Sequence, residues 1–455
     1  MEQVSERLAF KNRTNRCDDD EFPKTLSQDK KRPANEDNKS SRKRVKLTSN
    51  VETIDISDEE DDVVILSGTS SRRWSLFAMR NRAMSCAPFG YSRLPQMSTN
   101  ALLRSFVSSN KSDVYKCHSI DASSFMTLPY ACAYSHQAKR GGKPLLAVTT
   151  EQGTVHVLNT EKRNDWDVEP QRTVFQPYAN GIFDVQWSPL DTQLATAAAG
   201  SSIQVSTLDA SSCDAKTIRT MHGHAGTVKC LAWDPRTDGS LLCSGGRDGA
   251  ICLWDLRQDA DSPVITIADA HEDTSKGARP RPRKGKLPLA APQRSITSVL
   301  YTECDPYGVT SAGSLDGILR HWDFRLPKKV GARKPRIQPT HSSPLDPTVY
   351  LGSHRARGIT SLTPGSGPTA GLLFALGHDS RIHTYNLSSL VPLSGNTSNP
   401  EDDTYAFSHP NMRNTSFYVR TSLSPCGRWL ASGGAENGSV YLFDVSNAGR
   451  VQAGS

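Results

Sequence analysis

One short pattern recurs six times between residues 145 and 444. An apolar run ends in small residues, a turn follows, and a second run alternates apolar and polar side chains and often closes on Asp or Asn. The copies are LLAVTTEQGTVHVLN, QLATAAAGSSIQVSTLD, LLCSGGRDGAICLWD, GVTSAGSLDGILRHWD, LLFALGHDSRIHTYN and WLASGGAENGSVYLFD. A short Asp-Gly or Asn-Gly turn between two alternating runs is a β-hairpin signal. The pattern therefore predicts six hairpins.

The spacing inside the copies is constant. Six residues separate the turn residue from the position of Trp254 in the third copy, in the pairs Gln152 and Leu158, Ser201 and Thr207, Asp248 and Trp254, Asp316 and Trp322, Asp379 and Tyr385, and Asn437 and Phe443. Further strand-like runs that end in Ser-Pro or Asp-Pro precede three of the hairpins, at 183–189, 228–235 and 419–425. Each unit is thus expected to hold at least three strands, with a fourth in the linking segment.

The third unit carries a polar set that is similar to a WD40 repeat: Gly223-His224, Ser244, Asp248-Gly249 and Trp254-Asp255. The resemblance implies that His224, Ser244, Asp248 and Trp254 form a hydrogen-bonded tetrad inside one sheet. Such a tetrad is structural, because an indole N–H and an imidazole need partners in a tightly packed sheet.

The fourth unit matches the same set less completely. His271, Asp316 and Trp322 are in place, while Ala312 stands where Ser is expected. WD40 units stack radially, so the resemblance implies an all-β fold, a WD40 β-propeller, in which six blades are detectable and seven are expected.

The composition limits how much of the chain such a fold includes. Hydrophobic residues make up 36% of the 455 residues, and 1–110 is rich in Ser, Asn, Asp, Lys and Arg without a sustained period. A segment of this kind does not bury enough apolar surface to fold. We expect a mostly disordered tail at 1–110, the propeller at 111–446 and a short C-terminal tail at 447–455.

Two consecutive units end on the same four-residue box. Trp254-Asp255-Leu256-Arg257 and Trp322-Asp323-Phe324-Arg325 both read W-D-x-R. The boxes resemble those through which WD40 receptors dock on the damaged-DNA-binding adaptor of cullin-4 ubiquitin ligases. That resemblance assigns adaptor binding to both boxes, with the planar forks of Arg257 and Arg325 as directional donors. In the alternative interpretation each arginine pairs with an acid in its own blade.

Longer segments resemble a divergent, fungal-like member of the denticleless-type receptors of cullin-4 RING ligases. The matching segments are 128–135, 181–189, 243–257, 270–275, 311–325 and 414–425. The resemblance implies a non-catalytic, nuclear subunit that recognises replication-licensing proteins. Its protein substrates would be bound to the sliding clamp on chromatin and degraded in S phase and after DNA damage. The alternative is a chromatin-associated WD40 scaffold that binds histone or nucleic acid and has no ligase role.

A basic insertion follows the fourth of these segments. Residues 276–286 read KGARPRPRKGK, and further basic residues follow at Lys328, Lys329, Arg333, Lys334 and Arg336. A cationic arm favours phosphates or acidic protein surfaces. It could steer the ring toward chromatin, or it could serve only as a solubilising loop.

The tail holds two basic clusters with a polar spacer between them. Lys30, Lys31 and Arg32 form the first, and the second is Arg42, Lys43, Arg44 and Lys46. The arrangement resembles a bipartite nuclear localisation signal, which predicts binding to an import carrier. The alternative is a solvated charge run.

A second tail segment places four apolar residues after an acidic block. Val63, Val64, Ile65 and Leu66 follow Asp58-Glu59-Glu60-Asp61-Asp62. Such a tetrapeptide can add as a strand to a partner's sheet edge. It resembles a motif that binds SUMO, the small ubiquitin-like modifier; the alternative is a chance apolar run.

Several other classes of function lack their sequence signals. The chain has no glycine-rich phosphate loop, G-x-S-x-G elbow or H-E-x-x-H motif, and its cysteines show neither C-x-x-C nor zinc-finger spacing. No apolar run approaches the roughly 20 residues that span a bilayer. We therefore expect no catalytic residue, cofactor, metal, membrane contact or small-molecule substrate.

Overall fold

The computed structural model describes residues 111–448, except for 122–123, 165, 210–213, 273–293, 303–304, 326–336, 350–355, 395–402, 404, 437 and 447. The chain divides into two units, Met1–Leu94 and Pro95–Ser455, and every described residue belongs to the second. The two tail motifs, the basic insertion and the basic residues at 328–336 lie outside the described residues.

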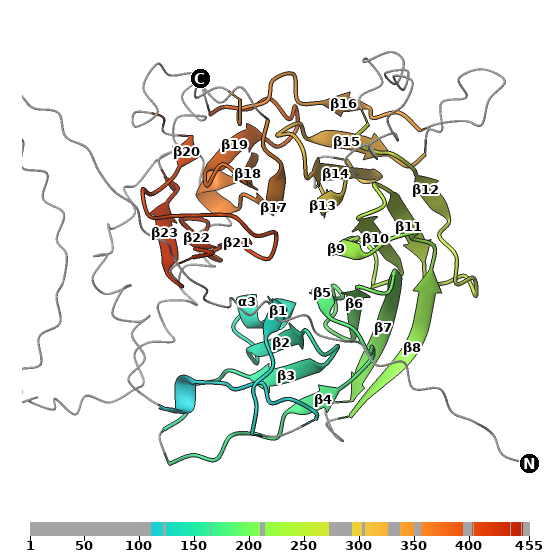
Figure 1. Ribbon diagram of the computed structural model, residues 1–455, viewed down its shortest axis with the longest axis vertical. Helices are drawn as coiled ribbons and strands as arrows, with labels where there is room; N and C mark the ends of the chain where they lie inside the picture. The colour runs from blue at the N-terminus through green and yellow to red at the C-terminus, as the bar shows by residue number, and fades with distance from the viewer. Residues whose placement is uncertain are drawn as a thin grey trace, which may run out of the picture. The chain divides into compact units, whose positions relative to one another are not determined.

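The described strands form six antiparallel sheets, which surround a common axis (Figure 1). Blades 1 to 3 consist of β1 (Pro129–Tyr134), β2 (Leu145–Thr150), β3 (Val155–Asn159) and β4 (Thr173–Phe175); β5 (Ile182–Trp187), β6 (Gln193–Ala198), β7 (Ser202–Asp209) and β8 (Asp214–His222); and β9 (Val228–Trp233), β10 (Leu241–Gly246), β11 (Ile251–Asp255) and β12 (Ile265–Ile267). The fold is therefore all-β, as predicted.

Blades 4 to 6 complete the set. They consist of β13 (Ile296–Tyr301), β14 (Gly308–Gly313), β15 (Arg320–Asp323) and β16 (His341–Ser342); β17 (Ile359–Pro364), β18 (Leu372–Gly377), β19 (Ile382–Asn386) and β20 (Ala406–Phe407); and β21 (Thr421–Leu423), β22 (Trp429–Gly433) and β23 (Val440–Asp444). A six-bladed propeller results. The seventh blade that we expected is not among the sheets of the described residues.

All six predicted hairpins are confirmed. They join the second and third strand of each blade, and in blade 3 the register pairs Ser244 with Cys252 and Leu242 with Trp254. Gly249 in this turn has a φ of +76°, and a Cβ there would lie 2.9 Å from the Arg294 carbonyl oxygen. Only glycine adopts this conformation without strain, which explains the Asp-Gly pair in the sequence.

The hydrophobic core lies between successive sheets. One cluster joins Cys243 and Ile251 of blade 3 to Val309 and Trp322 of blade 4. Small and β-branched residues on the middle strands leave room for the next sheet, and Trp254 and Trp322 are buried to 1% and 2% exposure. The first strands of neighbouring blades contact one another, so they line the axis.

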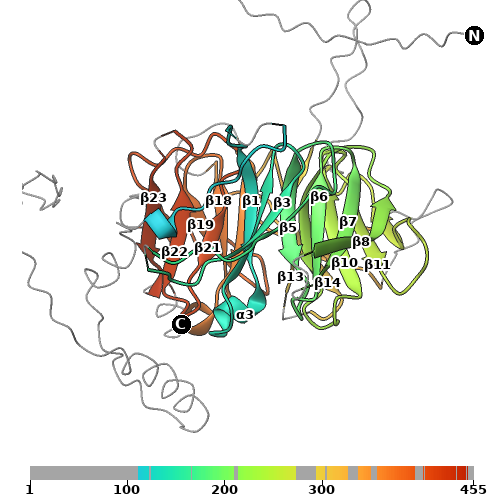
Figure 2. The ribbon, with the colours of Figure 1, turned by 90° about the horizontal axis from the view of Figure 1, so that it is seen from below.

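The meander gives the disc two distinct faces. In an antiparallel meander the first and third strands run in the same direction, so both end at one face. The short helix α3 (His136–Lys139), which follows β1, lies on that face, at the lower side of the disc in Figure 2. The hairpin turns lie on the other face, which we call the turn face. None of the helices in the described part of the chain has the length and hydrophobicity to cross a membrane.

Candidate functional site

The four polar residues singled out in blade 3 lie in one hydrogen-bonded chain. His224 Nε2 lies 2.8 Å from Ser244 Oγ, and the Trp254 indole N–H donates to the same oxygen at 2.8 Å. His224 Nδ1 lies 3.1 Å from a carboxylate oxygen of Asp248. Burial disfavours the imidazolium and is the largest single effect, but the hydrogen bond to Asp248, the neighbouring Cys252 and the charge of Asp248 together outweigh it and raise the pKa of His224 to about 9. The set holds one blade together and is closed to a substrate.

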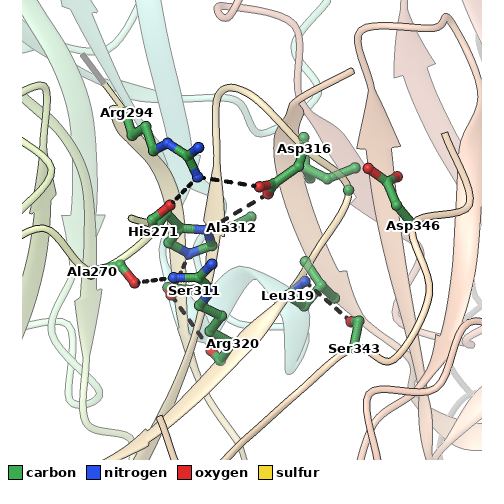
Figure 3. Close-up of polar contacts among 12 residues, drawn as sticks. Ala270, His271, Arg294, Ser311, Ala312, Asp316, Leu319, Arg320, Ser343 and Asp346 are labelled. Atoms are coloured by element: carbon green, nitrogen blue, oxygen red, sulfur yellow. Dashed lines mark hydrogen bonds and ion pairs between the residues drawn. The ribbon is translucent and has the colours of Figure 1, made fainter. Parts of the chain in front are cut away.

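The prediction for the serine of blade 4 was wrong. Ser311, not Ala312, fills the place: the Trp322 indole N–H donates to Ser311 Oγ at 2.8 Å, and His271 Nε2 lies 2.9 Å from it (Figure 3). The sequence comparison failed because five residues separate Ser311 from Asp316, whereas four separate the equivalent pair in blade 3. The longer turn shifts the serine by one position.

With the extra turn residue, Asp316, the fourth residue of the set, also lies farther from the histidine than Asp248 does in blade 3. His271 Nδ1 lies 3.9 Å from Asp316 Oδ1, too far for a hydrogen bond. Figure 3 shows the Arg294 guanidinium beside this pair: Nη1 donates to the His271 carbonyl oxygen at 2.6 Å and lies 3.8 Å from Asp316 Oδ2. Burial lowers the pKa of His271, and the nearby cations Arg320 and Arg294 act in the same direction.

Both W-D-x-R boxes form the same two-pronged contact. In the first, Arg257 donates from Nε and Nη2 to the two oxygens of Asp255, at 2.8 and 2.7 Å. In the second, Arg325 donates to Asp323 at 3.1 and 2.8 Å. Each arginine thus pairs with an acid of its own blade, as in the alternative interpretation. The side chains nevertheless remain 68% and 53% exposed, so the acid fixes the direction of a guanidinium that still faces solvent.

The electrostatics of the boxes match this geometry. The hydrogen bond from Arg257 lowers the pKa of Asp255, and Arg325 does the same to Asp323. The guanidinium of Arg325 also stacks on the ring of Tyr307, 4.0 Å from its centroid. The orientation of Arg325 is therefore set from two sides.

A third fork, which we did not identify from the sequence, lies beside the first. Arg236 donates from its backbone N–H and from Nε to Asp234 Oδ1, both at 3.0 Å. Trp233-Asp234-Pro235-Arg236 reads W-D-x-R as well, but it ends a first strand, and we compared only the ends of third strands. First and third strands end at the same face, so the three forks share it. We call it the Asp–Arg face.

A mainly apolar cavity of about 270 Å³ opens between blades 3 and 4 on the Asp–Arg face. Its lining comprises Asp234, Arg236, Thr237, Leu241, Leu253, Tyr301, Pro306, Tyr307 and Phe324. The hydroxyl of Tyr301 is buried and has no hydrogen-bond partner among the described residues. Since buried hydroxyls normally find partners, an apolar hollow with one unused polar group and cationic forks at its rim suits a protein side chain better than a reaction.

The described part of the chain contains no candidate metal site. No group of three or more His, Cys, Asp or Glu side chains there is placed to hold a metal ion. His224 and His271 are engaged in the contacts described above.

Comparison with known proteins shows which proteins the chain is similar to. A family model described as WD domain, G-beta repeat, matches residues 215–255 and 412–444. The denticleless protein homologs of Homo sapiens and Mus musculus are each 30% identical over 331 residues, which is 70% of this chain and 40% and 41% of those proteins. Protein lethal(2)denticleless of Drosophila melanogaster is 27% identical over 319 residues, 68% of this chain and 38% of that protein.

The chain thus spans about 40% of the length of these curated relatives. The similarity extends well beyond the two short repeats that the family model matches. The same residues form a propeller of six sheets. Together these findings identify the chain as a WD40 protein of the denticleless type.

Proposed function

We propose that the chain is the substrate-recognition subunit of a cullin-4 RING ubiquitin ligase and docks on the damaged-DNA-binding adaptor through the Asp–Arg face. The observation that carries the proposal is the pair of exposed, pre-oriented arginines in consecutive blades, Arg257 and Arg325. Both share their face with an apolar hollow of about 270 Å³, which Arg236 lines and whose lining residue Tyr307 stacks on Arg325. An apolar anchor with arginines around it is the usual make-up of an interface hot spot.

Docking uses each part of this face differently. The Asp255 and Asp323 carboxylates hold the guanidinium planes, so little conformational entropy is lost when a partner's carbonyl or carboxylate binds them. An apolar side chain of the adaptor fills the hollow between blades 3 and 4. A backbone carbonyl of the adaptor next to that side chain accepts a hydrogen bond from the hydroxyl of Tyr301, which has no partner among the described residues of the free chain. The exposed Asp–Arg pairs contribute little to the stability of the propeller itself.

The function of such a subunit is proximity. It holds the substrate near the ligase's charged conjugating enzyme and thereby raises the effective concentration of a substrate lysine at the ubiquitin thioester. The chain itself supplies no catalytic group. The proposed substrates are replication-licensing and cell-cycle proteins bound to the sliding clamp on chromatin, degraded in S phase and after DNA damage.

The N-terminal tail holds the proposed nuclear localisation signal and the proposed SUMO-binding motif. The basic clusters 30–32 and 42–46 would bind an import carrier, and 63–66 would bind SUMO on a neighbouring protein. Both assignments depend on the sequence motifs alone. Removing 30–46 should leave the tagged protein in the cytoplasm, and a 55–68 peptide should show NMR shifts on titration with SUMO.

The decisive test is adaptor recovery from cells. Replacing both arginines (Arg257→Ala with Arg325→Ala) should abolish co-purification of the adaptor and cullin while the melting temperature stays within a degree or two. Arg413→Ala, an exposed arginine in the loop before β21 on the turn face, serves as the matched control and should recover both proteins. Equal adaptor recovery from the double variant would refute the docking proposal. Recovery of histones without cullin would favour the chromatin-scaffold alternative.

A further inference from the structure

A cluster of aromatic side chains lies on the turn face, where the inner strands begin. Tyr130 of β1, Phe183 of β5, and Phe417 and Tyr418 before β21 bring together blades 1, 2 and 6. The ring centroids of Tyr130 and Tyr418 are 4.7 Å apart, and those of Phe183 and Phe417 are 5.8 Å apart. Phe417 and Tyr418 remain 37% and 38% exposed. We call these four residues the aromatic cluster.

A lysine from blade 3 reaches into this cluster. The ammonium of Lys229 lies 3.6 Å from the ring centroid of Phe417 and 4.0 Å from that of Phe183. No carboxylate of the described residues forms an ion pair with it. Burial, and after it the positive charge of Arg247, lowers the pKa of Lys229 to about 8. The ammonium is thus held by ring faces and has no counter-ion in the part of the chain that the structure describes.

The buried acid beside the cluster is already engaged. Asp184 Oδ1 accepts a hydrogen bond from Arg420 Nη1 at 2.7 Å, and Oδ2 accepts one from the backbone N–H of Leu231 at 2.7 Å. Asp184 is 1% exposed. Its charge is therefore matched by Arg420, and Lys229 remains available for an anion from outside.

Three of the segments singled out in the sequence meet here. Tyr130 belongs to 128–135, Phe183 to 181–189, and Phe417 and Tyr418 to 414–425. None of these residues is needed for the hydrogen-bonded sets of blades 3 and 4 or for the Asp–Arg face. Their common position on the turn face indicates one further site.

We propose that the aromatic cluster and Lys229 form a docking site for an acidic peptide segment. A carboxylate of the peptide pairs with the ammonium, and a neighbouring apolar or aromatic side chain packs on the exposed rings of Phe417 and Tyr418. The proposal deepens the function proposed above, on which it rests for the view that the segment belongs to a substrate. Because the cluster and the Asp–Arg face lie on opposite sides of the disc, one chain can hold both partners.

A peptide fits this site better than a nucleic acid does. Nucleic acids are held by many phosphate contacts on an open basic surface. Here one ammonium lies over two rings of the aromatic cluster, with Arg247 as the further cation that acts on it. The geometry suits one anionic group next to one apolar group, which an acidic–aromatic dipeptide supplies.

The test is fluorescence anisotropy with the purified full chain. The probe is a fluorescein-labelled peptide of alternating Asp and Phe, and its control has Asn in place of Asp. The acidic peptide should bind at least about tenfold more tightly than its Asn counterpart, as expected for a charge-assisted contact in a partly buried site. Lys229→Met should remove the difference in affinity between the two peptides, and Phe417→Ala should weaken the binding of both.

The pH dependence separates a direct contact from a change in packing. Binding of the acidic peptide should weaken as the pH rises from 7 to 9, because Lys229 loses its proton while the peptide stays anionic. Lys229→Arg should bind with little change over that range. Equal binding of the two peptides, or unchanged binding by Lys229→Met, would overturn the proposal.

The remaining outcomes distinguish this site from the others. A duplex DNA probe that binds with stronger dependence on Lys229 than the peptide does would overturn the peptide assignment. So would tighter binding of the chain's own 55–68 peptide, which also joins acids to apolar residues. Lys229→Met should still recover the adaptor, and the Arg257 and Arg325 double variant should still bind the peptide. Failure of one site thus leaves the other testable.

Discussion

Arg420 and Asp184 stand 236 positions apart in the chain and form a charged hydrogen bond of 2.7 Å between Nη1 and Oδ1. Arg420 precedes β21 of blade 6, whereas Asp184 lies in β5 of blade 2. The second amine, Nη2, donates to the carbonyl oxygens of Phe183 and Lys229 at 3.1 and 3.5 Å. One side chain thus joins blade 6 to blades 2 and 3 across the axis.

The first prediction concerns this link. Arg420→Met should lower the free energy of unfolding by about 2 kcal/mol, because it strands a buried carboxylate. The loss should be smaller than for a fully buried pair, since the Arg420 side chain is 34% exposed. Urea denaturation measures it. Arg428→Met breaks the more exposed pair with Asp444 within blade 6 and should change the stability by less than about 1 kcal/mol. Equal effects would show that the link across the axis is dispensable.

The second prediction concerns the serine of blade 4. Ser311→Ala should destabilise the protein by about 2–3 kcal/mol, because the buried Trp322 indole and His271 imidazole both lose their shared partner. Ser314→Ala, in the following turn, removes a hydroxyl without a hydrogen bond among the described residues and should change stability by less than about 0.5 kcal/mol. Thermal denaturation measures the loss of stability in both variants. Equal losses would mean that Ser311 does not support this blade more than its neighbour Ser314.

The third prediction separates two histidines by their charge. The pKa of His224 is raised to about 9 and that of His271 lies below its ordinary 6.5. At pH 7.5, NMR should therefore find His224 protonated and His271 neutral. The stabilisation from the His224 charge should be complete below about pH 6.5 and lost as the pH rises through about 9. Protonation of His271 works in the opposite sense and should destabilise the fold as the pH falls.

A matched substitution checks the His224 assignment. His224→Gln should lower the free energy of unfolding more at pH 6.5 than at pH 9.5, because only the wild-type protein loses its charge between these values. The pKa of Asp248 is also held below its usual value by His224, so Asp248→Asn should flatten the same pH dependence. A pH-independent difference between wild type and His224→Gln would contradict a charged His224.

The fourth prediction tests the cavity on the Asp–Arg face. Tyr301→Phe should leave stability unchanged or slightly higher, because the hydroxyl it removes has no partner among the described residues. The same variant should weaken adaptor binding by about fivefold, about 1 kcal/mol, the typical value of one hydrogen bond. Surface plasmon resonance against the immobilised adaptor measures this. Full affinity would mean that the hydroxyl stays unpaired in the complex.

The fifth prediction tests the third fork. Arg236→Ala should weaken adaptor binding in the same direction as the single changes Arg257→Ala and Arg325→Ala, since all three arginines lie on one face. The smallest of the three effects is expected for Arg236, whose side chain is 33% exposed compared with 68% and 53%. Arg140→Ala, on the same face in blade 1, is the control. A loss with Arg140→Ala as large as with Arg257→Ala would mean that general charge governs binding.

The sequence predicted the features that depend on residues close together in the chain, above all the hairpins. Turn chemistry and a fixed six-residue spacing located every hairpin, including that of blade 3 with Gly249 at its corner. The tetrad of blade 3 was implied by the resemblance of this unit to a WD40 repeat. The error at Ala312 arose when one extra residue entered the turn, because a one-residue shift moves a strand's side chains to the other face of the sheet.

Contacts between distant blades were beyond the sequence pattern. The pairing of Arg420 with Asp184 and the meeting of Tyr130 with Tyr418 depend on how the sheets close around the axis, which no local periodicity encodes. The segments that hold these residues were recognised as distinctive in the sequence. Their contacts with one another form only because the closed ring of sheets brings blades 1, 2 and 6 together.

The inner strands of blades 1 to 5 are six residues long, which sets the distance between the two faces. At about 3.3 Å per residue this amounts to roughly 20 Å of protein. A substrate anchored at Lys229 would start on the side of the disc that faces away from the adaptor. Lysines next to the anchored segment would then be shielded by the disc itself. Modification should concentrate on lysines far enough along the substrate chain to reach around its edge, so the spacing between anchor and acceptor becomes a property that selects substrates.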